Sequence, residues 1–188
     1  MARKAVEREL TKEVIMNAAG KLFVEHGFRH ISMRQIANEL GYSHGSLYYH
    51  FKNKADLFYS LVDRNYAQLE EKMDEILRLE TAEEEILRAM FLAFVEYGVS
   101  HQHDYEIMFI IRNEEFHPSL QEKPNRIYEK FAQAVFRLTG RQVTVSQVWS
   151  VFLSLHGFVS HYVRSGQTYE EVKTLAESHA DNLLKMLC

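Results

Sequence analysis

The sequence is poor in cysteine and proline, with one cysteine, Cys188, and two prolines, Pro118 and Pro124, in 188 residues. A single thiol cannot form a disulfide or a thiolate metal site within one chain, so we expect a reducing cytoplasm. The longest apolar runs, such as Met90 to Val95, are far shorter than the roughly 20 residues that cross a bilayer. The charged start of the chain has no apolar stretch behind it, so we expect neither a signal peptide nor a membrane partner.

The sequence also lacks any sustained alternation of apolar and polar residues, the pattern that indicates strands. Its apolar residues mostly recur three or four positions apart, which predicts an all-α fold. The expected helices cover residues 11–26, 33–40, 44–50, 54–79, 82–101, 104–113, 120–139, 145–165 and 169–187.

Short polar signals mark the ends of these helices. Four pairs have capping-box spacing, and Asn53 with Asp56 is a looser version. These pairs are Ser32 with Gln35, Thr81 with Glu84, Thr144 with Gln147, and Thr168 with Glu171. Glycines that tolerate the left-handed conformation are expected to end helices. They are Gly27, Gly41, Gly140 and Gly166.

The net charge of −4 is unevenly distributed along the chain. Residues 1–56 carry nine Lys and Arg against six Asp and Glu, whereas residues 57–188 carry thirteen against twenty. A basic end and an acidic remainder favour two separate tasks. We therefore predict a compact N-terminal unit at residues 1–56 and a larger helical domain at residues 57–188.

The first three predicted helices are expected to form a small core. Val14, Ala18, Leu22 and Phe23 form one apolar stripe on the first helix. The other two helices supply the facing side chains, which are Ile36, Ala37, Leu40, Leu47 and Phe51. Gly41 makes the turn between them, and Ser43 is placed to cap the third helix. This outline is typical of a helix-turn-helix, which lays one helix in the major groove of duplex DNA.

The side chains left exposed on the third helix have chemistry suited to DNA. They are His44, Ser46, Tyr48, Tyr49 and His50. Hydroxyls and imidazoles bond phosphates or base edges, and an aromatic ring can lie against a thymine methyl group. Lys52 and Lys54 stand where the next helix begins, so an ammonium and free backbone N–H groups can hold the same phosphate.

The segment from Thr11 to Leu57 resembles the DNA-binding domain of TetR-family repressors. The resemblance rests on Ala18-Ala19 with Leu22-Phe23, Gly27-Phe28, Ser32 to Ala37, and the run from Gly41 to Lys54. It implies phosphate or nearby groove contacts for Ser32, Arg34, Tyr48 and Lys54. It implies base reading by His44, Gly45, Ser46 and Tyr49, and Ser43 and His50 complete the predicted DNA-binding set. His44 stands where many members carry lysine, so its contact can be neutral or pH-sensitive.

Two other interpretations of the same residues are open. Gly41-Tyr42-Ser43-His44-Gly45 matches the nucleophile elbow of serine hydrolases, which requires a strand before the serine. A metal site is a second alternative, on histidines that lack a diagnostic spacing. These histidines are His101, His103, His117, His156 and His161. We predict neither an enzyme nor a metal or other cofactor.

The C-terminal domain is expected to dimerise and to bind a ligand. The helix at 145–165 is apolar on nearly every side, so it must be covered on two sides. The resemblance implies that the last two helices pair with those of a second copy. It also implies a cavity for a hydrophobic or aromatic effector. The candidate lining is Phe94, Tyr97, Met108, Phe109, Arg112, Phe131, Trp149, Phe152 and His156.

The resemblance thus predicts a bacterial homodimeric repressor that binds a palindromic operator and is released by a ligand. Two-fold symmetry suits this function, because two recognition helices one duplex turn apart read a palindrome. The alternative is a constitutive or activating DNA binder without an effector.

Overall fold

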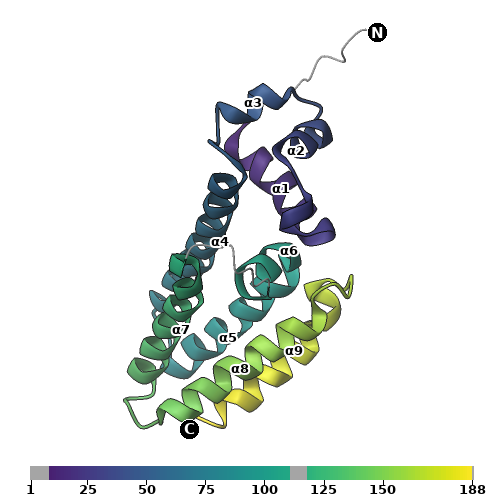
Figure 1. The fold of residues 1–188 in the computed structure, drawn as a ribbon. Coiled ribbons are helices and arrows are strands. Elements are labelled where there is room, and N and C mark those ends of the chain that lie inside the picture. The colour runs from purple at the N-terminus through teal and green to yellow at the C-terminus, as the bar shows by residue number, and fades with distance from the viewer. Residues whose placement is uncertain (1–8, 111–117, 188) are drawn as a thin grey trace. The chain divides into compact units, whose positions relative to one another are not determined.

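The computed structural model describes residues 9–110 and 118–187, which form helices joined by short turns (Figure 1). These residues contain no strand, so the prediction of an all-α fold is confirmed. The N-terminal elements are α1 (Lys12–His26), η1 (Phe28–His30), α2 (Met33–Leu40), α3 (His44–Tyr48) and α4 (Lys54–Leu77). The later elements are α5 (Glu83–Ser100), α6 (Gln102–Tyr105), the π-helix η2 (Glu106–Ile110), α7 (Pro118–Leu138), α8 (Val145–Tyr162) and α9 (Tyr169–Leu184).

The chain divides into two compact units, one ending at Arg64 and one beginning at Asn65. Residues of the long helix α4 belong to both units. None of the described helices combines the length and the apolar character that a membrane crossing requires.

The core of the first unit uses a different face of α1 from the one predicted. Ile15, Ala19 and Phe23 are fully buried, whereas Val14 is 37% exposed. Apolar residues occupy two neighbouring stripes of this helix, and periodicity alone does not choose between them. Packing against Ile36 and Ala37 of α2, both fully buried, selects the stripe that contains Ile15. The predicted stripe through Val14, Ala18 and Leu22 was therefore wrong, although its Phe23 is in the core.

Most of the predicted helix caps are confirmed. Ser32, Thr144 and Thr168 each form a capping box with the residue three positions later. Thr81 does not cap α5, because that helix begins after Ala82 and the Thr81 hydroxyl donates to Glu85 instead. Three consecutive glutamates in the first turn supply the negative charge that favours this helix end.

The second unit is built around α5, which packs against α7, α8 and α9. Its buried residues, from Ile86 to Val99, cover most of the helix circumference, and the remaining side carries the exposed Glu96 and Ser100. The sequence predicted that the helix at 145–165 is covered on two sides, and within one copy α8 leaves Val145 65% exposed and Trp149 43% exposed. Of these two helices, α5 is the more deeply buried, and α8 presents part of its apolar surface to solvent.

Candidate nucleic-acid interface

The turn between α2 and α3 depends on a left-handed glycine and a serine cap. Gly41 has φ +74°, a conformation that costs other residues free energy. The Tyr42 N–H donates to the Ala37 carbonyl at 2.9 Å, which closes the end of α2. Ser43 then caps α3, because its Oγ accepts from the Ser46 N–H at 3.2 Å. The two short helices are thus joined by three residues, as in a helix-turn-helix.

Side chains of α3 divide sharply between core and solvent. Leu47 is fully buried, whereas Tyr49, which directly follows the helix, is 92% exposed and Tyr48 is 46% exposed. The His44 ring meets the Tyr48 ring edge-on, with centroids 4.9 Å apart. A tyrosine that is almost wholly exposed gains no packing energy, so its large ring is available to a partner.

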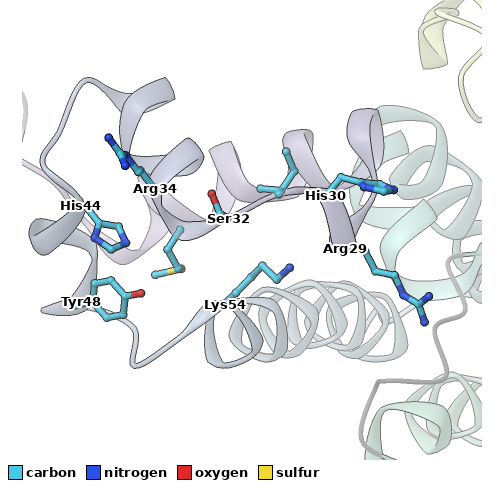
Figure 2. Close-up of a pocket in the computed structure, with 9 residues that line it drawn as sticks. Arg29, His30, Ser32, Arg34, His44, Tyr48 and Lys54 are labelled. Atoms are coloured by element: carbon cyan, nitrogen blue, oxygen red, sulfur yellow. The ribbon is translucent and has the colours of Figure 1, made fainter.

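An open groove of about 390 Å³ runs beside this helix-turn-helix (Figure 2). Arg34, His44 and Tyr48 lie at one end, Arg29 and His30 lie at the other, and Ser32 and Lys54 lie between them. Ile31 and Met33 complete the lining. The lining residues include three permanent cations and two imidazoles, and none is a carboxylate. Such a surface attracts a polyanion.

Lys54 lies between the two ends of the groove and contacts the η1 turn. Its Nζ donates to the Phe28 carbonyl at 2.8 Å and lies 4.2 Å from the centre of the Phe28 ring. The Phe28 ring packs against Phe23 and Phe58, with centroids 5.2 and 5.0 Å away. The lysine therefore connects the start of α4 to a turn that is anchored in the aromatic core.

The structure gathers five of the predicted DNA-binding residues into this groove: Ser32, Arg34, His44, Tyr48 and Lys54. Ser43, Gly45 and Ser46 are placed by α3, and Tyr49 and His50 follow its last turn. The Ser43 and Ser46 hydroxyls bond each other at 2.6 Å, so these two side chains stabilise the helix start. Arg29 and His30 were not predicted, although a basic pair that lies three and two residues before the Ser32 helix cap is a signal that could have identified them.

Predicted ligand-contacting side chains of the second unit lie within one aromatic cluster. Phe94, Phe131 and Phe152 are buried, and the Phe152 ring lies 5.7 Å from Phe94 and 5.4 Å from Phe131. Phe109 lies 6.2 Å from Phe94, and Trp149 stacks on Phe152 at 5.9 Å. The cluster joins α5, η2, α7 and α8.

Polar groups border this cluster. The Tyr105 hydroxyl hydrogen-bonds Nδ1 of the predicted His156, and burial lowers the pKa of that imidazole. The Tyr97 hydroxyl donates to the Asn65 carbonyl at 3.1 Å and lies 3.6 Å from the Met108 sulfur. Arg112, the remaining predicted member, lies outside the described residues. A mostly apolar cluster with one neutral hydrogen-bonding pair suits a ligand with few charges.

An ion pair between a buried carboxylate and an exposed arginine near this region was not predicted. Glu106 is buried on η2, and the Arg164 guanidinium binds both of its carboxylate oxygens, with Nε to Oε2 at 2.9 Å. Gln102 reinforces the contact, since its Oε1 accepts from the Arg164 N–H and its Nε2 donates to the Gln167 carbonyl, both at 2.9 Å. The turn after α8 is thus fastened to α6 and η2. The partners are 58 residues apart, and neither position carries a local signal.

The two alternative interpretations receive no support from the geometry. Ser43 caps a helix and follows a helix, so the strand that a nucleophile elbow requires is absent before it. Within residues 9–110 and 118–187, no three His, Cys, Asp or Glu side chains are grouped closely enough to hold a metal ion. His117 lies outside these ranges.

Comparison with known proteins identifies a family and relatives that this chain resembles. Residues 15–61 match the model of the bacterial regulatory proteins of the tetR family. The HTH-type transcriptional regulator SAR2658 of Staphylococcus aureus (strain MRSA252) is 30% identical over 138 residues, which are 64% of this chain and 72% of that protein.

Solved structures share the whole fold. FadR from Bacillus subtilis, solved with stearoyl-CoA, has a TM-score of 0.69 and 21% identity and covers 94% of this chain and 97% of its own. The ketosteroid regulator KstR2 of Mycobacterium tuberculosis has a TM-score of 0.75 and 16% identity and covers 95% of each chain. The fold and the interface are therefore those of helix-turn-helix transcriptional regulators that bind DNA. Within that class, the chain belongs to the TetR family, which is not a family of enzymes.

Proposed function

We propose that the protein is a homodimeric repressor that binds a palindromic operator and releases it when a hydrophobic or aromatic ligand binds the second unit. The DNA-binding part of this proposal rests on which side chains of α3 and its C-terminal end are buried in the core and which are exposed to solvent. Leu47 fixes the helix in the core, while Tyr49, Tyr48 and His44 face outward beside an acid-free groove.

In the proposed complex, base reading belongs to His44, Gly45, Ser46 and Tyr49. Ser32, Arg34, Tyr48 and Lys54 contact phosphates at the groove. Ser43, which also caps the start of α3, and His50, just after its end, complete the proposed DNA-binding set. Imidazole and hydroxyl groups form hydrogen bonds with base edges, whereas arginine and lysine neutralise phosphate charge. Specificity therefore depends on α3 and its immediate end, and affinity depends largely on the groove.

Exposed apolar side chains on the last two helices support the proposed dimer. Val145, Trp149 and Leu153 recur every fourth residue on α8, and Leu175 of α9 is 58% exposed. Apolar residues at this spacing share one helix face, so burying them against a second copy removes apolar surface from water. A symmetric dimer then supplies two recognition helices for the two halves of a palindrome.

The aromatic cluster supports the proposed ligand site. Its rings come from four elements, and the half-exposed Trp149 places one edge at the surface. Structural neighbours include a regulator solved with an acyl-CoA, which is a property of that protein. In this chain, the proposed ligand contacts are Phe94, Tyr97, Met108, Phe109, Phe131, Trp149, Phe152 and His156, together with the predicted contact Arg112. A ligand can release DNA only if it binds the DNA-incompetent shape more tightly than the DNA-bound shape.

The test begins with selection of duplexes from a random-sequence pool by the purified protein. We expect the recovered sites to share a palindrome and to bind the dimer with nanomolar affinity at physiological salt. A thermal-shift screen of hydrophobic and aromatic compounds should then identify ligands that also weaken binding to that duplex. Absence of any enriched sequence would contradict operator binding. Enrichment without any ligand that weakens binding would favour the constitutive alternative.

A further inference from the structure

The groove extends beyond the residues that the helix-turn-helix requires, as far as the η1 turn. Arg29 and His30 line the end opposite His44 and Tyr48, with Ser32 and Lys54 between the two ends (Figure 2). A phosphate chain that enters beside α3 and follows the groove meets cations along its whole length. This continuity distinguishes the pair from scattered surface charges.

The groove lining carries three permanent cations, Arg29, Arg34 and Lys54, and contains no Asp or Glu. In a chain of net charge −4, an acid-free lining of this kind favours an anionic partner.

The η1 turn is held rigidly enough to present its two basic residues. The His30 N–H donates to the Gly27 carbonyl at 3.2 Å, and the Gly27 N–H donates to the Phe23 carbonyl at 2.9 Å. The Phe28 ring packs into the core, and the Lys54 ammonium binds the Phe28 carbonyl and covers its ring. A contact group on a fixed support loses less entropy when it binds.

We propose that the η1 turn is a second contact site for the DNA phosphate backbone, in which Arg29 and His30 bind phosphate. Lys54, besides its own proposed phosphate contact, positions the turn. This inference depends on the proposed DNA-binding function and adds residues to it. An arginine can hold a phosphate with two parallel N–H donors, and a histidine adds one donor. Lys54 acts before DNA arrives, through its bond to the Phe28 carbonyl.

The decisive measurement is the salt dependence of operator affinity. The probe is the duplex recovered by selection, bound to the full chain at several salt concentrations. The double variant Arg29→Ala/His30→Ala should bind roughly 10-fold more weakly at 0.1 M salt. Its plot of log affinity against log salt should be shallower by about 1–2, because each lost phosphate contact removes about 0.9 from the slope. The control Lys72→Ala removes a charge from an exposed site on α4 outside the groove and should leave both quantities unchanged.

The positioning role has its own readout. Lys54→Met keeps the aliphatic stem but removes the ammonium, so amide hydrogen exchange at residues 28–30 should accelerate in the absence of DNA. The double variant Arg29→Ala/His30→Ala should leave exchange at Phe28 unchanged. An unchanged exchange rate in Lys54→Met would overturn the positioning role.

The outcomes separate this inference from the proposed function. If the wild type binds no duplex, the proposed function fails. If the wild type binds and the double variant binds equally with the same slope, only the second contact site fails. Titration with inorganic phosphate at constant ionic strength should give no saturable binding. Saturable binding that disappears in the double variant would indicate a free-anion site and would overturn the assignment to DNA.

Discussion

Gly98 lies at a tight contact between α5 and α8. A Cβ atom at this position would lie 2.3 Å from Val159 Cγ1 and 3.0 Å from the Tyr105 ring. Alanine is the better helix former, by about 1 kcal/mol, but here it must displace a buried valine and a buried tyrosine. A side chain at this crossing is therefore excluded by packing and not by backbone conformation.

We expect Gly98→Ala to lower the free energy of unfolding by roughly 1–3 kcal/mol, the usual cost of overpacking a core. Chemical denaturation with a far-ultraviolet circular dichroism readout measures this quantity. Gly45→Ala is the matched control, because only the Ser43 Oγ, at 4.0 Å, approaches its added Cβ. That control should be neutral or more stable than the wild type. Equal stability of the two variants would contradict a tight helix crossing at Gly98.

His156 couples stability to pH because burial lowers its pKa. The unfolded chain binds a proton near pH 6.5 that the folded chain does not, so stability falls as the pH drops below about 6.5. We expect His156→Gln to flatten the loss of thermal stability between pH 7 and pH 5. The exposed His103→Gln is the control and should retain the wild-type profile. If the His156→Gln profile follows that of the wild type, His156 does not cause the pH dependence of thermal stability.

At the scale of elements, η2 is fastened to the turn after α8 by the Glu106–Arg164 pair. Arg164 has φ +63°, and Arg141 elsewhere in the unit has φ +62°. Both arginines therefore occupy the left-handed region, but only Arg164 binds a buried carboxylate. This coincidence provides a matched pair for measuring the contribution of the ion pair.

We expect Arg164→Gly to be less stable than Arg141→Gly by roughly 1–3 kcal/mol. Both substitutions relieve the backbone conformation, but only the first leaves Glu106 buried without its cation. The value lies toward the lower end because the Arg164 side chain is 65% exposed. Equilibrium unfolding in urea at neutral pH compares the two variants, and indistinguishable midpoints would show that the pair contributes little.

The third helix provides a direct test of its outward face. Tyr48→Phe removes one hydroxyl from a half-exposed ring that lines the groove. If that hydroxyl donates to a phosphate, operator affinity should fall by roughly 1–2 kcal/mol, the scale of a hydrogen bond to a charged group. Fluorescence anisotropy at fixed salt measures the dissociation constant. An unchanged constant, with an unchanged melting temperature, would exclude the hydroxyl contact.

At the scale of the whole molecule, α8 and α9 carry the proposed dimer surface. Gly157 lies on α8 with no atom near the position of an added Cβ, so a large side chain there is tolerated within one copy. We expect Gly157→Arg to remain folded but to shift the protein toward monomer in sedimentation velocity. The exposed Gln133→Arg on α7 is the control and should remain dimeric. A monomeric wild type at micromolar concentration would contradict the proposed surface.

Loss of the dimer should also reduce operator affinity, because each copy alone reads half of a palindrome. Gly157→Arg is therefore expected to bind a half-site as well as the wild-type protein does at equal subunit concentration. Its binding to the full palindrome should be weaker. This result would show that the second unit contributes to DNA recognition by holding two copies together.

Much of the fold followed from signals that act over four residues or fewer. The capping boxes at Ser32, Thr144 and Thr168 and the left-handed Gly41 were predicted, because caps and turns are local hydrogen-bonding and steric effects. The Thr81 prediction failed because two helix starts one residue apart were both compatible with its sequence. The helix-turn-helix was recognisable for the same reason as the caps, since its residues are contiguous.

The sequence alone determined most of the helices, the turn between α2 and α3, and the residues of α3 that remain outside the core. It did not indicate that the segment expected as a helix at 104–113 forms the π-helix η2 at Glu106–Ile110. Only the tertiary structure decided which stripe of α1 is buried, and it alone brought together Tyr105 with His156 and Glu106 with Arg164, which lie 51 and 58 residues apart. It also joined the η1 turn to Lys54 across 26 residues. The physical reason is that helix propensity and capping depend on near neighbours, whereas contacts between distant residues depend on how complete helices pack against one another.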